Sequence, residues 1–92
     1  GNIFHTPTAN IQITSQNFSR HTSISLGWYH DVTYSLYNSG DAAGTVQVVI
    51  SGDYSGQLLS QTVTVSAGQS VTKTAVADSD QRDNELYITL LR

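Results

Sequence analysis

Residues 34–50 read YSLYNSGDAAGTVQVVI, and this stretch decides the fold class of the 92-residue chain. Apolar side chains alternate with polar ones on both sides of its centre. The apolar residues are Val32, Tyr34 and Leu36 in the first run, and Val46, Val48 and Ile50 in the second. Asn38-Ser39-Gly40-Asp41 separates the two runs with residues that favour turns. A period of two broken by such a turn predicts a pair of antiparallel strands with one buried face.

The same alternation recurs along the chain and predicts about seven strands and no helix. We expect strands at residues 11–15, 23–27, 28–38, 44–51, 58–65, 70–77 and 86–91, with a polar connection over residues 17–21. One sheet of this size would leave a whole apolar face in water, so two stacked sheets are expected. The sequence therefore predicts an all-β, antiparallel β-sandwich over residues 10–92. Residues 1–9 form an N-terminal arm, in which Pro7 opposes a place in a central strand.

The composition is low in charge and rich in hydroxyl groups. Charged residues make up 12% of the chain, which contains 12 Ser and 11 Thr. Thr suits the half-exposed surface of a sheet, and the scarcity of Lys and Glu, both strong helix formers, favours an all-β protein. Net charge is -3 and the four Lys and Arg residues are scattered, which argues against nucleic-acid binding. No apolar run approaches the ~20 residues of a membrane-spanning helix, so we expect no membrane insertion.

Cysteine and methionine are both absent from the chain. Without cysteine there is neither a disulfide framework nor a thiolate site. Because no methionine stands at position 1, we expect either a processed mature protein or a fragment of a longer one.

Two segments resemble a known family. NSGDAAGTVQVVI (residues 38–50) and LLSQTVTVSAGQSVT (residues 58–72) are similar to the immunoglobulin-like modules of bacterial and archaeal surface proteins, of the CARDB and FxLYD type. The matching residues are Asn38, Gly40, Asp41, Ala42 and Ala43, followed by Val63, Val65, Gly68 and Val71. The resemblance implies an immunoglobulin-like or fibronectin-III-like sandwich at the cell surface, used as a stalk, spacer, adhesion or assembly module. It implies no fixed active site.

The residues themselves carry no catalytic signature. His5, His21 and His30 could each supply a general base, but no local motif singles out a nucleophilic serine. The three histidines are 16 and 9 residues apart, a spacing that matches no local zinc-ligand pattern. We therefore predict that the protein is not an enzyme and has no cofactor, calcium being the one ion to consider.

The calcium hypothesis rests on an acidic loop. Four carboxylates fall within residues 78–85: Asp78, Asp80, Asp83 and Glu85. Calcium takes six to eight oxygen ligands, which such a loop can provide, although Arg82 offsets part of the charge and the spacing is not that of an EF-hand. The alternative is a solvated turn whose Asp and Asn side chains cap their own backbone.

Aromatic residues suggest a binding face. Tyr29 and Tyr37 fall on the side of their strand opposite to Val32, Tyr34 and Leu36, and Tyr87 points outward from the last strand. If these strands were neighbours, as in an immunoglobulin sandwich, Tyr37 and Tyr87 would share one exposed face. Exposed aromatic rows bind sugars or proteins, whereas cross-strand tyrosine pairs also simply stiffen a sheet.

Two further features concern the surface. Ile3 and Phe4 are apolar residues of the arm, which can act as a donor strand to a neighbouring copy or as a linker. Asn17-Phe18-Ser19 is an acceptor sequence for N-glycosylation if the chain passes through a glycosylating pathway.

Taken together, the sequence predicts a non-catalytic, secreted structural module. It would be a subunit of a surface filament or pilus, or a repeat of an adhesin or stalk, and its partners would be copies of itself or neighbouring domains. The alternative is a carbohydrate- or ligand-binding module that uses the tyrosine face.

Overall fold

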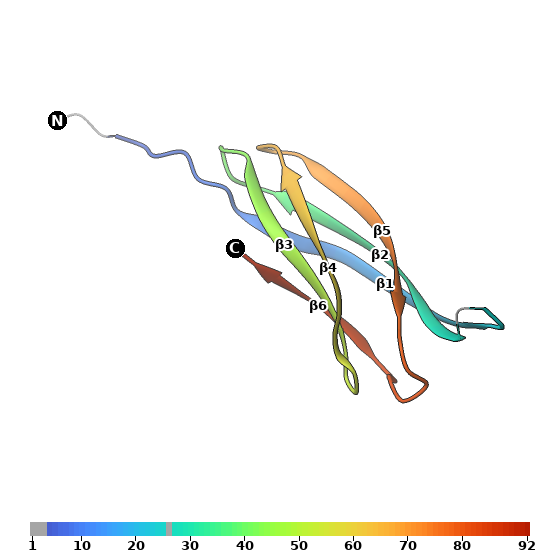
Figure 1. Cartoon of the computed structure of the whole chain (residues 1–92). Coiled ribbons are helices and arrows are strands. Elements are labelled where there is room, and N and C mark those ends of the chain that lie inside the picture. The colour runs from blue at the N-terminus through green and yellow to red at the C-terminus, as the bar shows by residue number, and fades with distance from the viewer. Residues whose placement is uncertain (1–3, 26) are drawn as a thin grey trace.

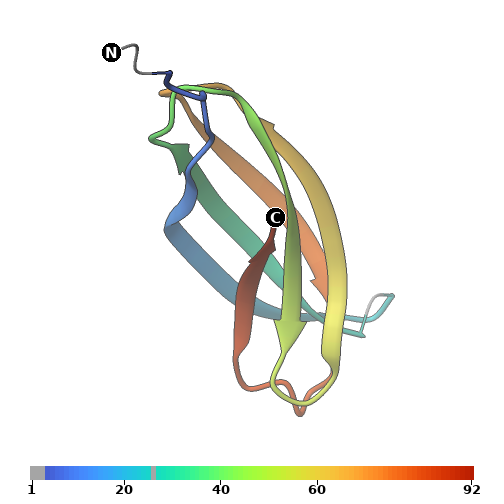
Figure 2. The same ribbon diagram turned by 90° about the vertical axis from the view of Figure 1, so that its left-hand side faces the viewer.

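The computed structural model describes residues 4–25 and 27–92, which form six strands and no helix. The strands are β1 (Ile11–Ser23), β2 (Gly27–Asn38), β3 (Gly44–Gly52), β4 (Gly56–Val65), β5 (Ser70–Asp78) and β6 (Leu86–Leu91) (Figure 1). They make two antiparallel sheets of three strands, in the orders β1-β2-β5 and β4-β3-β6. The sheets lie face to face as a β-sandwich, which confirms the predicted all-β class (Figure 2). Within these residues no helix is long and apolar enough to span a membrane.

The core lies between the two sheets and takes residues from both. Its buried apolar members are Ile11, Val32, Tyr34, Leu36, Val46, Val48, Ile50, Val63, Val65, Ala77 and Leu86. Most of these are the residues that the period-two pattern placed inward. The hydroxyl group of Tyr34, in β2, donates a 2.5 Å hydrogen bond to Oε1 of Gln61, in β4, and so joins the sheets through the core.

The prediction of seven strands is wrong, because β1 is one continuous strand of 13 residues. Residues 17–21, expected to be a loop, pair with residues 29–33 of β2. The expected second strand at 23–27 is wrong, because Ser23 ends β1, Gly27 begins β2, and residues 24 and 25 lie in a turn in which Ile24 is fully exposed. Leu26, also placed in that strand, lies outside the described residues. Residues 17–21 carry mostly polar side chains on both faces. The sequence therefore shows no hydrophobic alternation there from which a strand could be predicted.

The predicted pairing of the strands on either side of Asn38-Ser39-Gly40-Asp41 is also wrong. β2 and β3 belong to different sheets, so this segment crosses from one sheet to the other. The turn Ser66–Gln69 does the same between β4 and β5. Alternation identifies the buried face of a strand, but a partner beside the strand and a partner across the core leave the same pattern.

In the expected strand at residues 70–77, apolar side chains fall on both faces, with Val71 and Ala75 on one and Val76 on the other, and the structure shows the cause. β5 pairs with β2 in unbroken register and lies at the edge of its sheet, with its other side open. Lys73 and Val76, on opposite faces of β5, are therefore both exposed.

Candidate functional site

The base of the N-terminal arm is fixed by a buried asparagine at the end of β2. Asn38 is fully buried, and its side-chain oxygen accepts hydrogen bonds from the backbone N–H groups of Asn10 (3.0 Å) and Gly40 (2.9 Å). Its side-chain nitrogen donates to the carbonyl oxygens of Ala42 (2.8 Å) and Val65 (3.0 Å). All four hydrogen-bonding positions of the amide are thus used. One side chain joins the arm, the crossover and the end of β4.

The backbone of Asn38 also forms hydrogen bonds with the turn between β4 and β5. Its N–H donates to the carbonyl of Gln69 (3.0 Å), and its carbonyl accepts from the N–H of Gly68 (2.9 Å). The crossover from β2 to β3 and the turn from β4 to β5 therefore lie together at one end of the sandwich. The sequence pattern indicated Asn38 only as a turn residue. Its burial could have been predicted too, because Asn38 continues the inward alternation of Val32, Tyr34 and Leu36.

Gly40 and Asp41 hold the arm against this end. The backbone N–H of Asp41 donates to the carbonyl of Thr8 (3.0 Å), and the Thr8 N–H donates back to the Asp41 carboxylate (2.9 Å). The His5 ring also contacts this carboxylate. The Thr8 N–H and the His5 contact lower the pKa of Asp41. A Cβ atom at Gly40 would lie 2.1 Å from the Thr8 carbonyl oxygen, so only glycine permits this approach.

We call the contacts of Asn38, Gly40 and Asp41 with Thr8 and Asn10 the clamp. Beyond the clamp the arm has few contacts. Residues 4–10 form no strand, all are exposed, and the arm projects away from the sandwich (Figure 1). Phe4, one of the two residues proposed for assembly, is 89% exposed. Ile3, the other, lies outside the described residues. The arm is therefore anchored at its base and offers an apolar side chain near its tip.

Three hollows follow the side of the sandwich where β1 and β6 are the edge strands, and we call them together the β1/β6 groove. The first, of about 360 Å³, is lined by Phe18, Arg20, His30, Asn84, Glu85 and Leu86. The second is lined by Ile13, Thr14, Ser15, Gln16 and Ile88. The third is lined by Ala9, Ile11, Gly44, Thr45, Val46 and Arg92. Sequence analysis missed this groove, because it depends on which strands stand at the edges.

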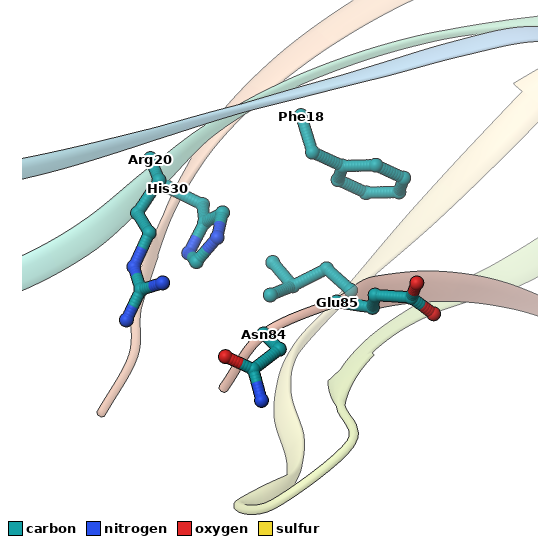
Figure 3. Close-up of a pocket in the computed structure, with 6 residues that line it drawn as sticks. Phe18, Arg20, His30, Asn84 and Glu85 are labelled. Atoms are coloured by element: carbon teal, nitrogen blue, oxygen red, sulfur yellow. The ribbon is translucent and has the colours of Figure 1, made fainter. Parts of the chain in front are cut away.

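Figure 3 shows the first hollow, with Phe18, Arg20 and His30 from one sheet facing Asn84 and Glu85. His30 is buried, and its Nδ1 lies 2.9 Å from the Ser79 hydroxyl. Burial lowers the pKa of His30, as do the charges of Arg20 and His21, while Asp83 opposes them. The environment of His30 thus favours the neutral form of its ring.

This serine–histidine contact lacks the third member that nucleophilic catalysis uses. None of the hydrogen bonds of the described residues joins a carboxylate to the His30 ring. His21 stacks on Tyr29 at 5.3 Å and lies 3.1 Å from the Asp31 carboxylate on the outer face of the sheet. The three histidines therefore lie in three separate places.

The acidic loop is built around one buried carboxylate. Asp83 is fully buried and accepts hydrogen bonds from the Tyr54 N–H (3.0 Å), the Ser55 N–H (2.7 Å), the Ser55 hydroxyl (2.6 Å) and the Asp80 N–H (2.9 Å). Burial alone would raise the pKa of Asp83, but the hydrogen bonds from Ser55, Asp80 and Tyr54 together outweigh it and hold this pKa below its usual range. The loop is thereby fixed to the turn between β3 and β4.

The other three predicted calcium ligands lie apart from this centre. Asp80 receives two hydrogen bonds from the Arg82 guanidinium, at 2.9 and 3.1 Å, which lower the pKa of Asp80 to about 2. Asp78 and Glu85 are exposed at the ends of β5 and of the loop. Among the residues described, no three acidic or histidine side chains gather into a group that could hold a metal ion.

The tyrosines predicted to share a face point outward but are separated. Tyr37 (40% exposed) lies on the outer face of the β1-β2-β5 sheet, and Tyr87 (49% exposed) on the outer face of the other sheet. The single-face arrangement is therefore wrong, because β2 and β6 are not neighbours. Tyr29 shares the face of Tyr37, eight residues away, which is roughly 26 Å along an extended strand.

Asn17, the predicted glycosylation position, lies in the middle of β1 and not in a loop. It pairs with Thr33 of β2, and its side chain is exposed on the outer face of that sheet. Glycosylation of Asn17 stays a prediction.

Comparison with known proteins gives no relative to set beside this geometry. No family model, no curated protein and no solved structure matches the chain.

Proposed function

We propose that this protein is a non-catalytic, extracellular structural module that is joined to neighbouring copies or domains through its N-terminal arm. In this role it is a subunit of a surface filament or a repeat of an adhesin or stalk. The observation that carries the proposal is the clamp on the arm. A fully buried asparagine and a sterically required glycine fix Asn10 and Thr8, while Phe4 beyond them stays exposed.

The strand order supports an immunoglobulin-like module. Sheets ordered β1-β2-β5 and β4-β3-β6 correspond to strands A-B-E on one side and C and F on the other in the immunoglobulin arrangement. Modules of this shape serve many unrelated functions, so the fold supports a structural role only together with the arm.

The low charge of the surface also suits assembly. Only 12% of the residues are charged, and charged residues are depleted at the centres of protein interfaces. Hydroxyl groups take their place on the outer face of the β1-β2-β5 sheet, where Ser35 and Thr72 are hydrogen-bonded at 2.8 Å.

The test compares the full chain with a chain that lacks residues 1–6 and keeps the Thr8 anchor. Light scattering and electron microscopy should show high-mass assemblies for the full chain and a monomer of 10 kDa or less for the truncated one. A full chain that stays monomeric at its highest soluble concentration contradicts assembly of copies through the arm, and with it the filament subunit. Far-UV circular dichroism of the truncated chain verifies that its sandwich is still folded.

A second candidate function is binding of a carbohydrate, and one observation favours it. The outer face between β2 and β5 has a hollow lined by Asp31, Thr33, Thr74 and Val76, close to the stacked pair of Tyr29 and His21. Aromatic and hydroxyl groups beside a hollow suit a sugar ring. Replacing Tyr29 with Ala should then abolish glycan binding, whereas Tyr87→Ala, on the other sheet, should leave it unchanged.

A further inference from the structure

The outer edge of β6 is open. In the part of the chain that the structure describes, β6 pairs with β3 on one side and with no strand on the other. An edge strand presents unpaired N–H and C=O groups, which another extended chain can pair with. On the opposite side of the sandwich the edge strands are β4 and β5, which the turn Ser66–Gln69 joins and which contact each other.

The β1/β6 groove runs along this open edge. Its apolar lining includes Ile13 and Phe18 from β1 and Ile88 from β6, all packed against the core but only partly buried. A strand added beside β6 would place every second side chain over this lining. Main-chain hydrogen bonds would then supply affinity, and the hollows would select the inward side chains.

We infer that the β1/β6 groove accepts an extended strand, and that its occupant is the N-terminal arm of a second copy of this chain. The inference rests on the proposed function and names the surface that receives the arm. In the arrangement of immunoglobulin domains, the position beside β6 is that of strand G, which here would come from the neighbouring molecule.

The chemistry of the arm fits this groove. Residues 1–19 contain no Lys, Arg, Asp or Glu, so the arm can enter an apolar groove without burying a formal charge, provided that His5 is neutral. The described part of the arm forms no strand of its own molecule, and it begins with the exposed Phe4. Pro7, which cannot donate to a sheet, lies at the base of the arm beside its Thr8 anchor.

The position of the arm favours a second copy over its own molecule. Ala9 lines the hollow at the Arg92 end of the groove, so the arm leaves the sandwich from that end. From there it points away from its own strands (Figure 1). Copies stacked end to end would bring the arm of one molecule to the groove of the next.

The absence of cysteine allows a direct test. Thr6→Cys places a thiol on the arm, and Gln16→Cys places one in the groove; both positions are exposed. Within one molecule the β1 segment from Ile11 to Gln16 alone spans about 16 Å, and the Thr8 anchor holds Thr6 beyond its far end; a disulfide allows only ~7 Å between Cα atoms. A disulfide between them must therefore link two copies. The control pair is Thr6→Cys with Thr62→Cys, an exposed position on the outer face of β4.

Under mild oxidation we expect the Thr6→Cys/Gln16→Cys variant to form disulfide-linked dimers and higher multimers. The Thr6→Cys/Thr62→Cys variant should not form them. Light scattering of the same samples reports assembly independently. If light scattering shows assemblies but the two variants cross-link equally, or neither cross-links, the groove is not the acceptor of the arm. In that case the inference is overturned and the proposed function is unaffected. If the samples are monomeric and no link forms, the inference is overturned together with the proposed assembly of copies on which it rests.

Discussion

Asn38 occupies a place in β2 where the alternation requires an apolar side chain, and Gln61 does the same in β4. Asn38 is fully buried and has four backbone partners, while Oε1 of the half-buried Gln61 accepts a hydrogen bond from the Tyr34 hydroxyl. A buried polar group with all its partners fixes one arrangement of the chain, because any shift leaves it unpaired. Two inward polar residues therefore specify how the sheets and their crossovers fit together.

Replacing Asn38 with Ala should lower the free energy of unfolding by about 3 kcal/mol, since it leaves buried backbone groups without partners. Urea denaturation followed by circular dichroism measures this loss. Asn84→Ala makes the same chemical change at an exposed loop position and should change stability by less than about 0.5 kcal/mol. Equal effects of the two substitutions would show that Asn38 does not hold the crossover.

Asp83 should make the protein sensitive to acid. Its pKa is depressed in the folded state, so its stabilising effect is present above the unfolded value of about 3.9 and is lost as the pH falls below that value. Asp83→Asn should therefore reduce stability at pH 7 and flatten its decline below pH 4. Urea titrations at several pH values test this. Asp78→Asn, at an exposed carboxylate, should retain the decline of the unmodified chain.

At the scale of elements, the arm and the acidic loop are both segments without regular structure that are fixed at defined points. The arm is clamped by the crossover after β2, and the loop before β6 is held on the turn between β3 and β4 through Asp83. The arm then continues as an unpaired segment, whereas the loop is held along its length, with Arg82 stacked 3.9 Å above the Tyr54 ring. This difference is why the arm is the candidate for assembly.

Gly40→Ala should release the base of the arm, because the new Cβ would collide with the backbone of Thr8 and Asn10. We expect faster hydrogen exchange at the Asp41 and Ala42 amides, which donate to the Thr8 carbonyl, and faster proteolysis of the arm. Gly27→Ala is the matched control: its Cβ meets nothing within 4 Å, and the strain of its φ of 71° acts at the turn between β1 and β2. Unchanged exchange at Asp41 in the Gly40 variant would contradict the clamp.

Calcium should leave the melting temperature unchanged. Asp80 is engaged by Arg82, and every hydrogen bond to Asp83 comes from an N–H or O–H donor, so a metal ion would have to displace these partners. Thermal unfolding with calcium and with a chelator measures the difference. A rise in melting temperature that Asp83→Asn removes would establish the calcium site that the acidic loop suggested.

At the scale of the whole molecule, three connections carry the six described strands from one sheet to the other: after β2, after β4 and after β5. Among these strands only β1–β2 and β3–β4 are hairpins of consecutive strands. The remaining pairings join strands distant in the sequence, and the core contains side chains from both sheets. Neither sheet can cover its apolar face without the other, so the sandwich should unfold as one unit.

Val63→Ala, in the β4-β3-β6 sheet, tests this cooperativity. The substitution should lower the free energy of unfolding by about 2 kcal/mol, as expected for a buried methyl-bearing side chain. Trp28, the single tryptophan, lies in β2 of the other sheet, so its fluorescence reports on that sheet. Fluorescence and far-UV circular dichroism should shift to the same urea midpoint. Separate midpoints would mean that the sheets unfold independently.

The sequence by itself determined the all-β class and the inward faces of most strands, because a period of two and turn residues are local properties. Val32, Tyr34 and Leu36, or Val46, Val48 and Ile50, could be placed inward without knowing their neighbours. The tertiary structure alone decided which strands pair, that β1 extends through polar residues, and that Tyr37 and Tyr87 lie on opposite outer faces. It also decided that β1 and β6 stand at the open side. These are properties of contacts between distant segments, and alternation along one strand contains no record of whether its partner lies beside it or across the core.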